Sequence, residues 1–151
     1  MAGVSTSQLL RGLDDVEARL EKVAHAADDL TPVWPQIGRL WDDRQNSVFA
    51  SNGFGRWAPE ALVTLRSNQS PLVDTGVMRQ GLTMAHPIWD SKKGAAWGAP
   101  RSDRRVYNVA VFHVYGTSRM PKRIPVPPLR AAERKAWVAL VAKHLHKAVH
   151  D

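Results

Sequence analysis

Cysteine and long apolar runs are both missing from this sequence, and each absence excludes a class of protein. With no cysteine, the chain cannot carry a disulfide scaffold, a thiol nucleophile or a thiolate-ligated zinc or iron–sulfur site. No apolar run approaches the ~20 residues that span a bilayer. Gln8, Arg11 and Asp14 lie among the N-terminal leucines, which is unlike a signal peptide. We therefore expect a soluble, globular protein of the cell interior that has no membrane partner.

Motifs of catalysis are missing as well. No serine lies in a nucleophile elbow, no His-Glu-x-x-His motif occurs, and Gly53-x-Gly55 is not followed by the residues of a phosphate loop. His146 and His150 have the spacing of two residues that could share a metal ion. Together with His144, however, they are better interpreted as the basic end of a helix. We predict that the protein is not an enzyme and binds neither a cofactor nor a metal.

The net charge of +7 is unevenly distributed along the 151 residues. Residues 1–60 carry six basic and nine acidic side chains, a net charge of −3. Residues 61–151 carry fifteen basic and five acidic side chains, a net charge of +10. A uniformly basic chain would indicate a nucleic-acid binder, whereas in this chain the net charge changes from negative in the first part to positive in the second.

The first half of the chain has the apolar spacing of four and three residues that is typical of a helix packed on another helix. The members of this seam are Leu9, Leu13, Val16, Leu20, Val23, Ala27, Leu30, Trp34, Ile37, Trp41, Arg44 and Val48, of which only Arg44 is polar. Thr31-Pro32 is typical of a helix start, so the pattern predicts two helices, 6–30 and 32–49.

Three aspartate pairs accompany this seam at intervals of fourteen residues, and they begin at Asp14, Asp28 and Asp42. Fourteen residues are two heptads, so each pair lies at the same position beside the seam. Adjacent carboxylates on a helix point about 100° apart and do not chelate an ion by themselves. We interpret the pairs as an acidic face that is either solvated or in contact with a basic partner.

The middle of the chain alternates turn signals with possible strands. A loop at 50–60 leads into a short helix at 59–66. Residues 78–89 alternate loosely between polar and apolar and are interpreted as a strand, which a turn at 90–94 joins to a second strand at 95–99.

The last third begins with an apolar run, Val106–Tyr115, which Gly116 ends in the manner of a helix C-cap. Ile124–Pro128 contains three prolines and suits only an edge strand or an extended arm. The final element is a helix at 129–149, whose Trp137, Leu140, Val141 and Leu145 face inward while Lys135, Lys143 and Lys147 face outward.

The predicted fold class is α+β, with an N-terminal helical pair, a small antiparallel sheet, a further short helix and a C-terminal helix. We expect a single domain over residues 1–151. Its helical part is 1–50, its strands and loops are 51–128, and its C-terminal helix is 129–151.

Three basic loops, at 92–93, 101–105 and 119–123, could neutralise phosphates. Aromatic residues are not interleaved with them as in a groove for single strands. The basic residues of the C-terminal helix are spread around it and form no single reading face. Non-specific affinity for nucleic acid is therefore open, while sequence-specific readout has no support.

Four short pieces, in a fixed order, carry a resemblance to a known family. They are Gly55-Arg-Trp57-Ala-Pro59, Pro71-Leu72-Val-Asp-Thr75-Gly76, Val109-Ala110-Val-Phe-His113-Val-Tyr-Gly116 and Ile124-Pro-Val-Pro-Pro128-Leu129. Their order and spacing over about residues 45–130 resemble the phage virion morphogenesis family of tail-completion and neck proteins, which includes the phage Mu G-like proteins. Val109 and Val126-Pro127 depart from the family pattern, which often has Tyr at the first position and Ala-Arg at the second.

The resemblance implies a structural protein of the virion, assembled in the host cytoplasm, that forms a ring in the neck and joins the tail to the head. Its implied partners are further copies of itself, with sixfold symmetry expected, and the adjacent neck, tail-terminator or tail-tube and head-completion proteins. DNA would pass through the lumen without sequence-specific binding. A small basic DNA-binding or packaging accessory protein is the alternative function, and a toxin or hydrolase lacks a catalytic constellation.

The charge asymmetry leads to a hypothesis about the subunit interface. We expect the acidic helical half of one subunit to contact the basic strand-and-loop half of the next, head to tail. The candidate interface residues are Asp14, Asp28, Asp42, Trp57, Arg101, Arg104, Arg105, His113, Arg119, Lys122 and Arg123.

Replacing Asp14, Asp28 and Asp42 with asparagine removes three negative charges and is expected to weaken association, since the contact is electrostatic in part. Added salt should weaken association of the unmodified protein in the same direction. The mass of the particle, measured by sedimentation at low and high salt, checks both expectations. Ring formation that the three substitutions leave unchanged would count against the hypothesis.

Overall fold

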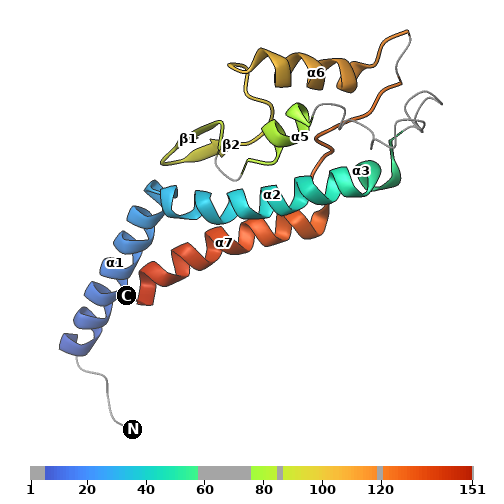
Figure 1. The fold of residues 1–151 in the computed structure, drawn as a ribbon. Helices are drawn as coiled ribbons and strands as arrows, with labels where there is room; N and C mark the ends of the chain where they lie inside the picture. The colour runs from blue at the N-terminus through green and yellow to red at the C-terminus, as the bar shows by residue number, and fades with distance from the viewer. Residues whose placement is uncertain (1–5, 58–75, 85–86, 119–120, 151) are drawn as a thin grey trace.

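The protein is described by a computed structural model over residues 6–57, 76–84, 87–118 and 121–150. Three long helices dominate it: α1 (Thr6–Asp28), α2 (Trp34–Ala50) and α7 (Ala131–His150). Helix α7 runs beside α2 and ends against the middle of α1, so that the N-terminal part of α1 projects beyond it (Figure 1). Within the described ranges, no helix combines the length and apolarity needed to cross a membrane.

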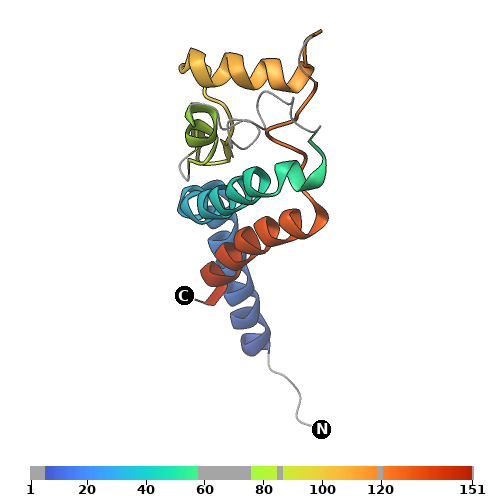
Figure 2. The same cartoon turned by 45° about the vertical axis from the view of Figure 1, so that its right-hand side comes forward.

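The remaining elements stack on the opposite side of α2. Helix α5 (Val77–Leu82) and the antiparallel hairpin of β1 (Trp89–Ser91) and β2 (Gly94–Ala96) form the next layer. Helix α6 (Arg104–Tyr115) packs on α5 and is the outermost layer of the stack (Figure 2). The predicted α+β class is therefore confirmed, with its helical pair, its small antiparallel sheet and its C-terminal helix.

The junction between α1 and α2 lies where Thr31-Pro32 predicts it. A short 3-10 helix, η1 (Thr31–Val33), turns the chain, and the backbone N–H of Thr31 donates to Asp29 Oδ1 at 3.0 Å. This turn separates the apolar seam into two parts that differ in burial. On α2 the seam is buried, whereas its members Leu13, Val16 and Leu20 on α1 are exposed.

The strand predicted for residues 78–89 is wrong over its first half, where the chain forms α5. Gly76 adopts a left-handed conformation (φ 71°) that starts the helix, and Met78, Gly81 and Leu82 are buried at the helical spacing of three and four. A loose alternation therefore concealed a helical period. The strands are shorter than expected, three residues each, and their turn is Lys92-Lys93.

Residues 51–128 also contain more helix than the expected strands and loops. A short helical turn, α3 (Asn52–Gly55), follows α2, and Asp103 begins α6 by accepting hydrogen bonds from the N–H groups of Arg105 and Val106. Gly116 ends α6, as the sequence predicts. The helix predicted at 59–66 lies outside the described residues.

Three tryptophans attach distant segments to α2 and the loop that follows it. The indole N–H groups donate to backbone carbonyl oxygens: Trp34 to Ser91 at 2.8 Å, Trp41 to Leu82 at 2.8 Å and Trp57 to Ile124 at 2.9 Å. Each ring is also buried in the apolar core. Every bond therefore joins a packed ring to the backbone of a segment at least 41 residues away in the sequence.

A further attachment, with three hydrogen bonds, comes from Arg44, the single polar member of the seam, which is only 5% exposed. Its guanidinium donates to the carbonyl oxygens of Pro127 and Pro128 and pairs with the carboxylate of Glu133 (Nε to Oε2, 3.2 Å). The neighbouring side chain of Gln45, in the amide orientation that satisfies both its ends, donates to the carbonyl oxygen of Pro125 at 3.2 Å. The proline segment therefore pairs with no described strand and is instead held by side chains of α2.

Glu133 completes this contact from the first turn of α7. Burial raises the pKa of its carboxyl group, but hydrogen bonds from the backbone and guanidinium of Arg130 and from Arg44 outweigh burial and leave the pKa below its ordinary value. The carboxylate therefore stays charged and joins the start of α7 to α2.

Replacing Arg44 with alanine is expected to lower the free energy of unfolding by about 2–4 kcal/mol, because the buried carbonyl oxygen of Pro127 and the part-buried one of Pro128 lose their donor and Glu133 loses one of its two arginine partners. Denaturant unfolding followed by circular dichroism measures the loss. Arg39→Ala, an exposed change on the same helix, serves as the control and should stay within about 0.5 kcal/mol. Equal losses for both variants would contradict the role assigned to Arg44.

Candidate assembly surfaces

An apolar stripe of three side chains lies exposed on α1. Leu13, Val16 and Leu20 are 53–65% exposed. Helix α7 packs on a different side of α1, where His144 Nε2 lies 3.2 Å from the carbonyl oxygens of Ala26 and Asp29. These three side chains therefore take no part in the packing of α7 on α1.

A second apolar stripe lies on the outer side of α6. Val109, Phe112 and Tyr115 are 40–79% exposed. The inner side of α6 is buried close against α5, because a Cβ atom on Gly81 would lie only 2.6 Å from the side chain of Val106. Helix α6 is therefore apolar on both sides, although only its inner side is packed within the subunit.

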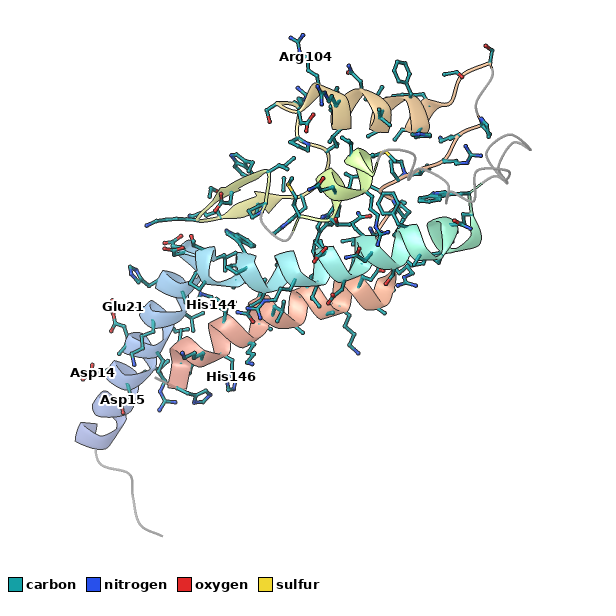
Figure 3. The ribbon with its side chains drawn as sticks, in the orientation of Figure 1. Asp14, Asp15, Glu21, Arg104, His144 and His146 are labelled. Carbon is teal, nitrogen blue, oxygen red and sulfur yellow. The ribbon has the colours of Figure 1, made fainter. Side chains whose placement is uncertain are left out.

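The charges beside the two stripes are opposite in sign. Asp14, Asp15, Glu17 and Glu21 are exposed on α1. Arg101, Arg104 and Arg105 are exposed around the first turn of α6. Positive side chains at a helix N-terminus oppose the helix dipole, so the dipole does not favour Arg104 and Arg105 in the first turn of α6. Figure 3 shows Asp14, Asp15 and Glu21 at one end of the molecule and Arg104 at the other.

The structure does not bring the three predicted aspartates together on one face. Asp14 is exposed on the projecting part of α1. Asp28 forms an ion pair with Lys93 of the hairpin turn at 2.7 Å, and this hydrogen bond and the lysine charge hold the pKa of Asp28 below its ordinary value. Asp42 accepts a hydrogen bond from Asn46 at 3.0 Å on α2. Two of the three therefore already have partners inside the subunit.

The basic and aromatic candidates fall into two groups. Trp57 and Arg123 lie in the interior of the subunit, where Trp57 packs edge-on against Phe49 with ring centroids 5.7 Å apart. The three arginines near α6 and Lys122 are exposed, whereas Arg119 lies outside the described residues. The structure therefore places the accessible basic candidates around α6.

His113 is a half-buried residue on α6. Its backbone carbonyl accepts a hydrogen bond from the N–H of Arg123 at 2.8 Å, and its buried Nδ1 has no partner among the described atoms. Burial lowers the pKa of the imidazole, and the positive charge of Arg123 lowers it further. The side chain is thus a neutral part of the packing under α6.

His146 and His150 are exposed at the end of α7, with tilted rings whose centroids lie 4.2 Å apart, whereas His144, expected at the same solvated helix end, is half-buried against the carbonyl oxygens of Ala26 and Asp29. In the part of the chain that the structure describes, no three or more histidine, aspartate or glutamate side chains gather in a way that could hold a metal ion.

Sequence reasoning did not single out the apolar residues of either stripe as surface residues. The signal was present on α6, because Asn108 and His113 are the only polar side chains in Val106–Tyr115, and a helix with so many apolar residues is often covered on more than one side. On α1 the signal was the seam itself, whose members were all expected to pack inward.

Known proteins provide no match for this chain, whether they are compared as family models, as curated sequences or as solved structures.

Removing the titratable group at His113 is expected to flatten the dependence of stability on pH. Because the pKa of His113 is lower in the folded state, the unfolded chain binds more protons below about pH 6.5, and acidification destabilises the native protein until the folded pKa is reached. Melting temperatures of the parent protein and of His113→Leu, compared from pH 8 to pH 5, test this. Parallel curves through that window would contradict it.

Proposed function

We propose that the chain is a structural virion subunit of a tailed phage, a head–tail connector, neck or tail-completion protein that assembles into a ring. The assembly part of this proposal depends on one observation: two exposed apolar stripes with opposite charges at opposite ends of the subunit. Apolar side chains that are grouped in this way favour a site of contact with another protein. The assignment to a phage neck comes from the sequence resemblance.

The pieces that carry the resemblance meet in the structure. The indole N–H of Trp57 donates to Ile124, and the N–H of Arg123 donates to the carbonyl oxygen of His113. The aromatic-glycine loop, the helix with its histidine and the proline segment are therefore parts of one packed unit. This supports the resemblance as one of fold-determining residues, while the piece at 71–75 lies outside the described residues.

A connecting ring needs subunits that are rigid and that have two different contact surfaces. Features of the structure favour the rigidity and also the two unlike surfaces. The tryptophan and Arg44 hydrogen bonds join the layers on either side of α2. The acidic end at α1 and the basic end at α6 favour contacts between unlike surfaces, which close into a ring when the rotation per subunit allows it. DNA would pass through the lumen of such a ring.

The alternative is a small basic DNA-binding or packaging accessory protein. The exposed Arg101, Arg104 and Arg105 around the start of α6 favour it, because clustered arginines neutralise phosphates. The apolar stripe that follows them on α6 favours a protein surface instead.

Native mass spectrometry of the purified full chain distinguishes these functions when it is measured alone, with DNA and with the products of neighbouring genes. We expect a closed oligomer of defined copy number without DNA, formed by the chain alone or on a neighbouring virion protein. A monomer that binds DNA at physiological salt and joins none of these proteins would favour the alternative. A monomer in all mixtures would contradict the proposal.

A further inference from the structure

The stripe on α1 has the size and spacing of a helix–helix contact. Leu13, Val16 and Leu20 follow each other at intervals of three and four residues, which aligns them on one side over about 10 Å. The residue after each of them is acidic: Asp14, Glu17 and Glu21. The stripe is therefore an apolar ridge with a parallel acidic ridge beside it.

The stripe on α6 matches it in length and is opposite to it in charge. Val109, Phe112 and Tyr115 extend over about 9 Å of helix. Arg105 lies four residues before Val109 and so continues the same side of the helix, and Arg104 lies next to it. The α6 stripe is therefore an apolar ridge with a basic end.

These two stripes cannot meet within one chain. Helix α6 is the outermost layer on one side of α2, whereas the N-terminal half of α1 projects from the other side (Figures 1 and 2). A contact between them needs two copies of the protein.

We infer that the α1 stripe of one copy docks on the α6 stripe of the next, with the acidic ridge of α1 beside the arginines of α6. The inference rests on the proposed ring and names the surfaces that form it. Each copy offers one stripe of each kind, so the contact is heterologous and repeats from copy to copy until the ring closes.

Charge decides against the symmetric pairings of the same surfaces. Two α1 stripes placed together would bring the acidic ridges of both copies close to each other, and two α6 stripes would bring the arginines together. Like charges across a contact suppress association, whereas opposite charges favour it. The occupant of each stripe is therefore the other stripe of a second copy.

Thiol cross-linking tests the contact directly, because the chain has no cysteine of its own. Full-length Leu20→Cys protein is mixed with full-length Phe112→Cys protein and treated with a short bis-maleimide. We expect a heterodimer in a yield about tenfold or more above that of Leu20→Cys mixed with Val138→Cys, since a specific contact raises the local thiol concentration. Val138 is a matched control, because it is an exposed apolar side chain on α7.

A charge exchange provides the second measurement. Introducing Glu17→Lys and Glu21→Lys into the Leu20→Cys protein should lower the cross-linking yield at low salt, and adding Arg104→Glu and Arg105→Glu to the Phe112→Cys partner should restore it. Circular dichroism of each variant checks folding, and all these side chains are exposed.

The outcomes separate this contact from the ring itself. Cross-links between two Leu20→Cys chains, or between two Phe112→Cys chains, in place of the heterodimer would overturn the head-to-tail contact. A parent protein that assembles while the heterodimer stays at the control yield would also overturn it and leave the ring intact. If the parent protein does not assemble and the heterodimer also stays at the control yield, both the contact and the proposed ring are overturned.

Discussion

The buried guanidinium of Arg44 is the contact on which the arrangement of the layers depends. The segment that leads into α7 is rich in proline, so it has few N–H groups with which to join a sheet. It offers carbonyl oxygens instead, and Arg44 of α2 donates to two of them while pairing with Glu133 in the first turn of α7. A polar side chain inside an apolar seam thereby positions the start of the helix that packs against both α1 and α2.

The layered arrangement around α2 explains why the two apolar stripes remain exposed. Helix α2 lies in the middle, with α7 and α1 on one side and α5, the hairpin and α6 on the other. Among the described residues, each outer layer is one helix thick, so an outer helix has a described neighbour on one side only. Apolar residues on the outward sides of α1 and α6 therefore depend on a contact with another molecule for their burial, and the acidic and basic residues beside them make the two ends unlike.

Several local features were readable from the sequence because they depend on neighbouring residues. Thr31-Pro32 marks the turn between α1 and α2, Gly116 ends α6, and the outward lysines of α7 follow from its periodicity. The helix α5 was missed because its six residues are too few to show a clear period, and Gly76 was not recognised as its start. Of the candidate interface residues, Arg101, Arg104 and Arg105 around the start of α6 are exposed, whereas Trp57 and Arg123 lie inside the subunit.

The heptad seam shows which features follow from the local sequence pattern and which depend on the tertiary structure. Leu13 and Trp41 belong to the same apolar repeat, and sequence alone defines that repeat, the helices that carry it and the change of net charge along the chain. Only the path of the chain decides that Trp41 is buried and Leu13 exposed, and that Asp28 pairs with Lys93 of the same subunit. An apolar spacing specifies which side of a helix avoids water, but the neighbour that covers this side is chosen by turns such as Thr31–Val33 and by contacts between residues far apart in sequence.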